Sequence, residues 1–307
     1  MQHQLLFNAI LSSGINSNKA ILVTAFSRPE LLRKNLHSVR NAVRSTEYTK
    51  IVVWQTNASN ASDMQVVLDE NSDLIDVLIC IDGQSRSPLQ NINFNCILGM
   101  NLAFDLLGCD WVVSIEEDIQ IGYDTLVFAE EMTRRYARNR AFRAVNFGSI
   151  EPFSESLKFT YSLLRYGPHQ QGMLFTRKLW KRYTLKEYLR RCETEPFDSL
   201  FGTFMKTGFV VTPNSSRSLD EGRGGTHTVG GDLDHYFEGQ AQSWVGSAPF
   251  FIEEYLRVDM EHQWRIDALI YRKRQDLVFD IKHAVFNFDK FVFKGYFLRA
   301  RTKDKLI

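Results

Sequence analysis

The sequence predicts an α/β protein, with a mixed sheet flanked by helices. Short apolar segments rich in β-branched residues alternate with segments whose apolar residues recur at helical spacing. Strands that alternate with helices in this way usually pair in parallel. The composition agrees, because 307 residues at 44% hydrophobic and 24% charged supply a core and exclude a disordered or coiled-coil chain.

The first strand and helix follow directly from residue pattern. Residues 20–26 form an uninterrupted apolar run, as in a strand buried on both faces. Ser27, Pro29 and Glu30 then predict a helix start, with Ser27 as the capping residue. Apolar residues continue at helical spacing to Val43, so this segment is a strand followed by a helix.

The same alternation predicts the later elements. They are a strand at 51–54, a helix at 63–70, a strand at 77–81, a helix at 95–107 ended by Gly108, and a strand at 111–115. The second half is more irregular, with a helix at 123–138, strands at 143–147 and 173–176, a helix at 179–188, a Gly- and Ser-rich loop at 212–231 and one or two strands within 281–301.

Charge and cysteine usage limit the function classes. The chain carries 37 basic and 36 acidic residues, so no overall field attracts nucleic acid, and we expect no nucleic-acid partner. The four cysteines form no CxxC pair, which fits a reducing compartment. The sequence shows neither a clear signal peptide nor an apolar run of membrane-spanning length, so we expect a cytoplasmic protein.

Three consecutive acidic residues follow the strand predicted at 111–115. Glu116, Glu117 and Asp118 repel one another unless water or a cation neutralises them. Three acidic residues alone favour a solvated strand end, whereas their position at the carboxyl end of an apolar strand favours a ligand site. A hard divalent cation with oxygen ligands would supply the neutralisation.

The order of the motifs resembles GT-A fold glycosyltransferases, and most nearly the N-acetylglucosaminyltransferase I group, glycosyltransferase family 13. The resemblance covers roughly residues 20–237 and includes the segment up to Arg28, the acidic motif and the later loop that ends in a histidine. It implies that Asp118 binds Mn²⁺, or Mg²⁺ in its place. It places Glu116 and Glu117 in the site of a nucleotide-sugar donor, with Glu117 near the ribose or sugar, and Arg28 at the uracil or the diphosphate.

The resemblance extends to three motifs in the second half. In the segment 168–180, Gly172 fits a position where the backbone approaches the donor sugar. Asp198 corresponds to the catalytic base of an inverting transferase, with Glu195 as the fallback, although Ser199 stands where the family has a second aspartate. The loop 215–227 resembles one that closes over the diphosphate, and it contributes Arg217, Arg223 and His227.

Two departures leave the identity of the nucleotide open. The family's uridine-contacting aspartate has no evident equivalent here, and Thr56 or Asn57 stands at its place. Asn93 replaces a histidine before the helix that leads to the acidic motif. Asparagine still hydrogen-bonds a base or ribose, so we expect nucleotide binding to persist while exclusive use of uridine nucleotides is in doubt.

The resemblance implies metal-dependent transfer of a sugar, from a donor such as UDP-N-acetylglucosamine, to a hydroxyl of a glycan or glycoconjugate with inversion. The expected organisation is an N-terminal extension (1–19), a nucleotide-sugar-binding half (20–124), an acceptor and catalytic half (125–237) and a C-terminal extension (238–307).

Several alternatives stay open at this stage. One is a retaining GT-A transferase that uses another nucleotide sugar, and another is a non-catalytic glycan-binding relative. A sugar-phosphate nucleotidyltransferase would need a Gly-rich basic loop after the first strand, which residues 26–29 do not provide. The basic and aromatic C-terminal end is best explained by core aromatics and surface bases, with weak contact to an anionic membrane surface as the second interpretation.

Overall fold

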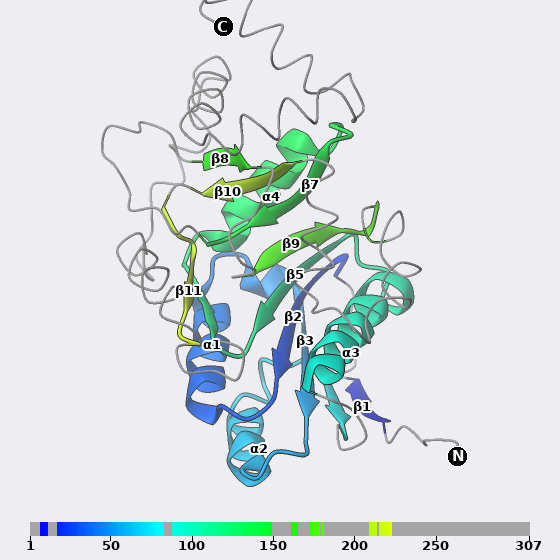
Figure 1. Cartoon of the computed structure of the whole chain (residues 1–307), viewed down its shortest axis with the longest axis vertical. Coiled ribbons are helices and arrows are strands. Elements are labelled where there is room, and N and C mark those ends of the chain that lie inside the picture. Colours follow the sequence, from blue (N-terminus) through cyan, green and yellow to red (C-terminus); the bar gives the residue numbers. More distant parts are fainter. Residues whose placement is uncertain are drawn as a thin grey trace, which may run out of the picture.

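The structure, a computed structural model, describes residues 7–11, 17–82, 88–148, 161–164, 172–178, 180, 209–213 and 215–222 (Figure 1). Its strands in the main sheet are β1 (Phe7–Leu11), β2 (Lys19–Ala25), β3 (Thr49–Gln55), β4 (Val77–Ile81), β5 (Trp111–Glu116), β7 (Phe142–Asn146), β8 (Tyr161–Leu164), β9 (Met173–Thr176) and β10 (Phe209–Pro213). The helices are α1 (Pro29–Asn41), α2 (Ala61–Glu70), α3 (Pro88–Asn101) and α4 (Thr125–Tyr136), with short turns η1 (Ser45–Glu47) and η2 (Leu102–Leu106). A separate two-stranded ribbon pairs β6 (Ile119–Ile121) with β11 (Ser218–Asp220).

The main sheet has nine strands in the order β1-β4-β3-β2-β5-β9-β7-β10-β8. Strands β4, β3, β2 and β5 are mutually parallel, whereas β9 runs antiparallel to β5. This confirms the predicted mixed sheet. The strand order reverses between β2 and β5, and such a switch point is where open α/β sheets bind ligands, outside the carboxyl ends of the strands.

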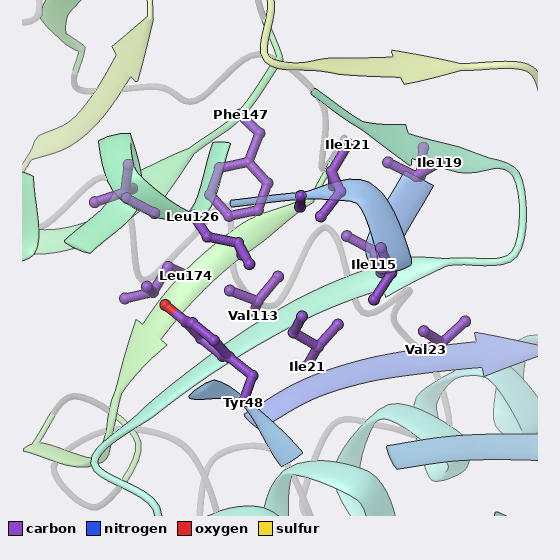
Figure 2. Close-up of a cluster of buried hydrophobic side chains, with 14 of the residues drawn as sticks. Ile21, Val23, Tyr48, Val113, Ile115, Ile119, Ile121, Leu126, Phe147 and Leu174 are labelled. Carbon is purple, nitrogen blue, oxygen red and sulfur yellow. The ribbon is translucent and has the colours of Figure 1, made fainter. Parts of the chain in front are cut away.

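Two apolar clusters cover the two faces of the sheet. Alternate residues of β2 divide between them, so that Ile21 joins the cluster that α1, α2 and α4 cover, and Leu22 joins the cluster that α3 covers. Figure 2 shows the first cluster, to which Ile21, Tyr48, Val113 and Leu126 contribute side chains. Burial on both faces explains why the strand reads as a continuous apolar run.

The N-terminal segment contains a strand where only an extension was expected. Residues Phe7–Leu11 form β1 and pair antiparallel with β4, with Phe7 opposite Ile81 and Leu11 opposite Val77. The strand is five residues long and its partner lies some seventy residues later, so local pattern gives little indication of it.

Three further boundaries differ from prediction. The residue that caps α1 is Arg28 and not Ser27, and no side chain forms a capping hydrogen bond there. Helix α3 begins at Pro88, seven residues before the predicted start. The predicted loop 212–231 contains the end of β10 and all of β11, because both segments pair with strands far away in the sequence. Within the described ranges, no helix combines the length and apolar character needed to cross a membrane.

Candidate functional site

The candidate site lies at the carboxyl ends of β2 and β5, where the strand order reverses. Thr24 and Glu116 are opposite each other in the parallel pair, and the N–H of Glu117 donates to the carbonyl of Thr24 at 2.9 Å. The turn after β2, which carries Arg28, is therefore held beside the acidic segment after β5. In the structure Arg28 contacts both Glu117 and Asp118, three residues that the sequence assigned to the donor and metal site.

Glu117 holds the turn after β2 in place. Its carboxylate accepts hydrogen bonds from the N–H of Phe26 at 2.6 Å, the N–H of Ser27 at 3.4 Å and Nε of Arg28 at 2.9 Å. The side chain is only 3% exposed. Both oxygens accept hydrogen bonds within the protein, so Glu117 positions the Arg28 turn, and its nearness to the ribose or sugar stays a prediction.

Asp118 and Arg28 form the charged pair that faces outward from this anchor. Nη1 of Arg28 lies 2.8 Å from Oδ2 of Asp118, and the arginine side chain remains 33% exposed. Burial raises the pKa of Asp118 above its usual range and Glu117 adds to this, while the positive charge of Arg28 opposes it. Burial alone would lower the pKa of Arg28, but Asp118, Glu117 and Glu116 outweigh burial and raise it. The guanidinium of Arg28 therefore stays protonated in the site.

Asn35 fixes the acidic turn from below. This residue of α1 is fully buried, and its Nδ2 donates to the carbonyls of Glu116 at 2.9 Å and Ile119 at 2.6 Å. These two carbonyls flank Glu117 and Asp118, so helix α1 sets the shape of the turn that carries the candidate ligands. Asn35 was not among the predicted site residues, although a polar residue between Leu32 and Leu36 on a buried helical face is a detectable signal.

Two carboxylates crowd around the α-carbon of Gly222. A Cβ atom at this position would lie 2.4 Å from Oδ2 of Asp118 and 2.8 Å from Oδ1 of Asp220. The glycine N–H donates to that same oxygen of Asp220 at 2.7 Å, and the N–H of Glu221 donates to the carbonyl of Asp118 at 2.9 Å. The β6–β11 ribbon thus brings Asp220 to Asp118 from about one hundred residues away in the sequence.

This arrangement fits a divalent cation whose coordination shell is completed by oxygen atoms of a substrate. Mg²⁺ and similar ions are commonly held by one or two carboxylates together with substrate phosphates, and Asp118 and Asp220 offer such a pair of hard oxygen donors. Among the described residues, no group of three His, Cys, Asp or Glu side chains comes together as a self-contained metal centre. The residues present therefore suit an ion whose remaining ligands are phosphate oxygens and water.

The predicted nucleotide-contacting amides lie at or behind the same edge of the sheet. Oδ1 of Asn57 accepts from Nε2 of Gln55 at 2.6 Å, directly after β3. Asn60 donates to the carbonyl of Ser27 at 2.7 Å, which ties this loop to the Arg28 turn. Asn93, in contrast, is a buried residue of α3 with 1% exposure, so it lies in the interior of the helix packing. Asn57 thus lies just past the carboxyl end of β3, whereas Asn93 is buried within α3.

Arg217 does not belong to a loop that closes over a ligand. The residue is fully buried, with Nε 3.1 Å from Oδ1 of the equally buried Asp124. Nη1 donates to the carbonyl of Ser215 at 3.1 Å. Burial lowers the pKa of Arg217 to about 10, against the opposing charge of Asp124. The expectation of a diphosphate contact is therefore corrected to an internal ion pair.

Gly172 also has a packing explanation. Its φ is +91°, and a Cβ atom would lie 2.9 Å from Cγ2 of Ile115 and 2.9 Å from Cδ2 of Phe147. The position therefore requires glycine because of backbone conformation and core packing, and the approach to a donor sugar stays a prediction. Asp198, Glu195, Arg223 and His227 lie outside the described residues, as does the basic and aromatic C-terminal end.

Comparison with known proteins identifies no family. No family model matches the chain, and neither does any curated protein. Among solved structures, the chain is similar to a mannose-1-phosphate geranyltransferase from Thermus thermophilus, with a TM-score of 0.37, 15% identity, and 64% of this chain and 73% of that chain covered. It is also similar to S. aureus TarS, with a TM-score of 0.41, 14% identity, and 63% of this chain covered. The match spans 35% of TarS, about a third of its length. Both similarities are too low to assign an activity, so the α/β class rests on the observed strand order.

Proposed function

We propose that this protein is a metal-dependent glycosyltransferase that binds a nucleotide-sugar donor at the carboxyl ends of β2 and β5. The observation that carries the proposal is the ion pair of Arg28 with Glu117 and Asp118 at the switch point, where the carboxylates of Asp118 and Asp220 both lie against Gly222. Cation-binding carboxylates next to an outward-facing guanidinium suit a diphosphate group.

Each described residue has a distinct part in this proposal. Asp118 and Asp220 hold the cation, which supplies charge stabilisation to the departing nucleoside diphosphate. Arg28 contacts the diphosphate, since its planar fork of donors matches phosphate oxygens. Glu117 and Asn35 position the two segments that bring these groups together. Asn57 lies where a nucleotide base or ribose would extend along the sheet edge.

The finer assignment follows the family resemblance. We propose a UDP-sugar such as UDP-N-acetylglucosamine as the donor and a hydroxyl of a glycan or glycoconjugate as the acceptor. Transfer proceeds with inversion, with Asp198 taking the proton from the attacking hydroxyl and Glu195 as the fallback base. The anomeric configuration of the product, read by NMR, tests this directly, and a product that retains the donor configuration removes the need for such a base.

Calorimetric titration of UDP and GDP, each with Mn²⁺ and with EDTA, tests the proposed site. One nucleotide is expected to bind in a manganese-dependent way, and Asp118→Ala is expected to abolish that dependence. Glu221→Gln is the matched control, because this neighbouring acid pairs outward with Lys34 and Gln120. Binding of neither nucleotide under any condition would reject the proposed function, and equal losses in both variants would reject Asp118 as the ligand.

A further inference from the structure

We propose that Arg28 and a divalent cation compete for Asp118, so that the cation transfers Arg28 from the protein's carboxylate to the donor's diphosphate. This inference rests on the proposed function and adds a coupling device to it. It assigns Arg28 two successive partners, Asp118 before the ligands bind and a phosphate group afterwards. The consequence is that cation and nucleotide each bind weakly alone and strongly together.

The competition arises at a single atom. Oδ2 of Asp118 lies 2.8 Å from Nη1 of Arg28, and this same oxygen and Oδ1 of Asp220 both lie against Gly222. A cation held between Asp118 and Asp220 would therefore take the oxygen that the guanidinium now contacts. Two positive groups on one carboxylate oxygen repel each other, so Arg28 must withdraw when the cation arrives.

Arg28 withdraws without leaving the site. Its Nε stays bonded to Glu117 at 2.9 Å, and Glu117 is itself held by the backbone N–H groups of Phe26 and Ser27. Only the outer nitrogens need to exchange partners. The side chain is 33% exposed, so these nitrogens reach the solvent side where a bound diphosphate would lie.

The exchange couples the two ligands thermodynamically. A cation alone must displace Arg28 and leaves the guanidinium without its second carboxylate. A nucleotide alone must attract Arg28 away from Asp118 and leaves that buried carboxylate without its counterion. Together each ligand replaces the partner that the other removes, and such coupling is reciprocal.

Titration of Mn²⁺ into the protein without nucleotide tests the sign of this effect. Arg28→Gln removes the competing charge but keeps an amide that can donate to Glu117. Mn²⁺ is therefore expected to bind this variant at least fivefold more tightly than the wild type. This factor is at the low end of typical coupling between two binding sites. The same variant is expected to bind UDP more weakly when Mn²⁺ is present. Arg33→Gln is the matched control, since this exposed arginine of α1 pairs with Glu30 and Glu70 and both affinities should stay at wild-type values.

The outcomes separate the inference from the proposed function. Unchanged or weaker Mn²⁺ binding by a folded Arg28→Gln, in a protein that still binds UDP with Mn²⁺, would overturn the exchange and leave the proposed function intact. Loss of nucleotide binding by the wild type would reject the proposed function itself.

A second measurement uses the wild type and does not depend on a variant that folds. In ¹⁵N-arginine NMR, Mg²⁺ alone is expected to free the rotation of the Arg28 Nη groups that Asp118 restricts, and UDP is expected to restrict it again. Nη groups that stay restricted in saturating Mg²⁺ would also overturn the exchange.

Discussion

Removing the amide of Asn35 should destabilise the fold and loosen the candidate site together. The side chain is fully buried and donates two hydrogen bonds, to the carbonyls of Glu116 and Ile119. Each such bond contributes about 1 kcal/mol net, and a buried carbonyl left without its donor adds roughly 1 kcal/mol or more. Asn35→Ala should therefore lower the free energy of unfolding by about 2–4 kcal/mol, the upper end including the small cavity.

Urea denaturation measures this loss, and two further variants assign it. Asn41→Ala removes an exposed asparagine from the same helix, whose amide contacts His37, and should change stability by less than about 0.5 kcal/mol. Asn35→Asp keeps the side-chain size but loses the donor amide, so it should cost at least as much as Asn35→Ala. If Asn35→Ala and Asn41→Ala had equal unfolding free energies, the amide would not hold the acidic turn.

Two other perturbations test particular contacts. Gly222→Ala places a methyl group 2.4 Å from Oδ2 of Asp118 and forces that carboxylate to shift, so calorimetry should show weakened Mn²⁺-dependent nucleotide binding; wild-type affinity would mean that the cation does not depend on the position of this carboxylate. Asp124→Ala leaves the buried guanidinium of Arg217 uncompensated and should lower the unfolding free energy by about 3–5 kcal/mol in urea titrations. The folded fraction should keep its nucleotide affinity, and a selective loss of that affinity would restore Arg217 as a ligand contact.

The parallel strands were predictable because their signal is local. Strands β2 and β3 are buried on both faces, and β4 and β5 are buried on one face and partly buried on the other, so each reads as an apolar run, and the observed bounds lie within two residues of the predicted ones. Strand β11 was not predictable, because three residues acquire their conformation only by pairing with β6. The start of α3 was missed for a related reason, since its asparagines favour loops in isolation and are buried here by the sheet.

Part of the site's membership was predictable, but the orientation of its side chains was not. Position at the carboxyl end of a strand identified Glu117 and Asp118, and the family resemblance identified Arg28. The inward role of Glu117 depends on backbone N–H groups that residue identity does not reveal. Arg217 was assigned to the surface because arginine is almost never fully buried without a partner, and that partner, Asp124, lies more than ninety residues away in the sequence.

In its observed position Arg28 contacts the oxygen of Asp118 that the cation needs, and it also favours the ionised form of Asp118. Burial and the neighbouring Glu117 both raise the pKa of Asp118, and a protonated carboxyl is a poor cation ligand. The guanidinium of Arg28 opposes that rise and so favours the carboxylate form. A site without Arg28 would therefore gain cation affinity from lost competition but lose some of it to protonation as the pH falls. The advantage of Arg28→Gln in Mn²⁺ binding should accordingly be largest at high pH and shrink on acidification.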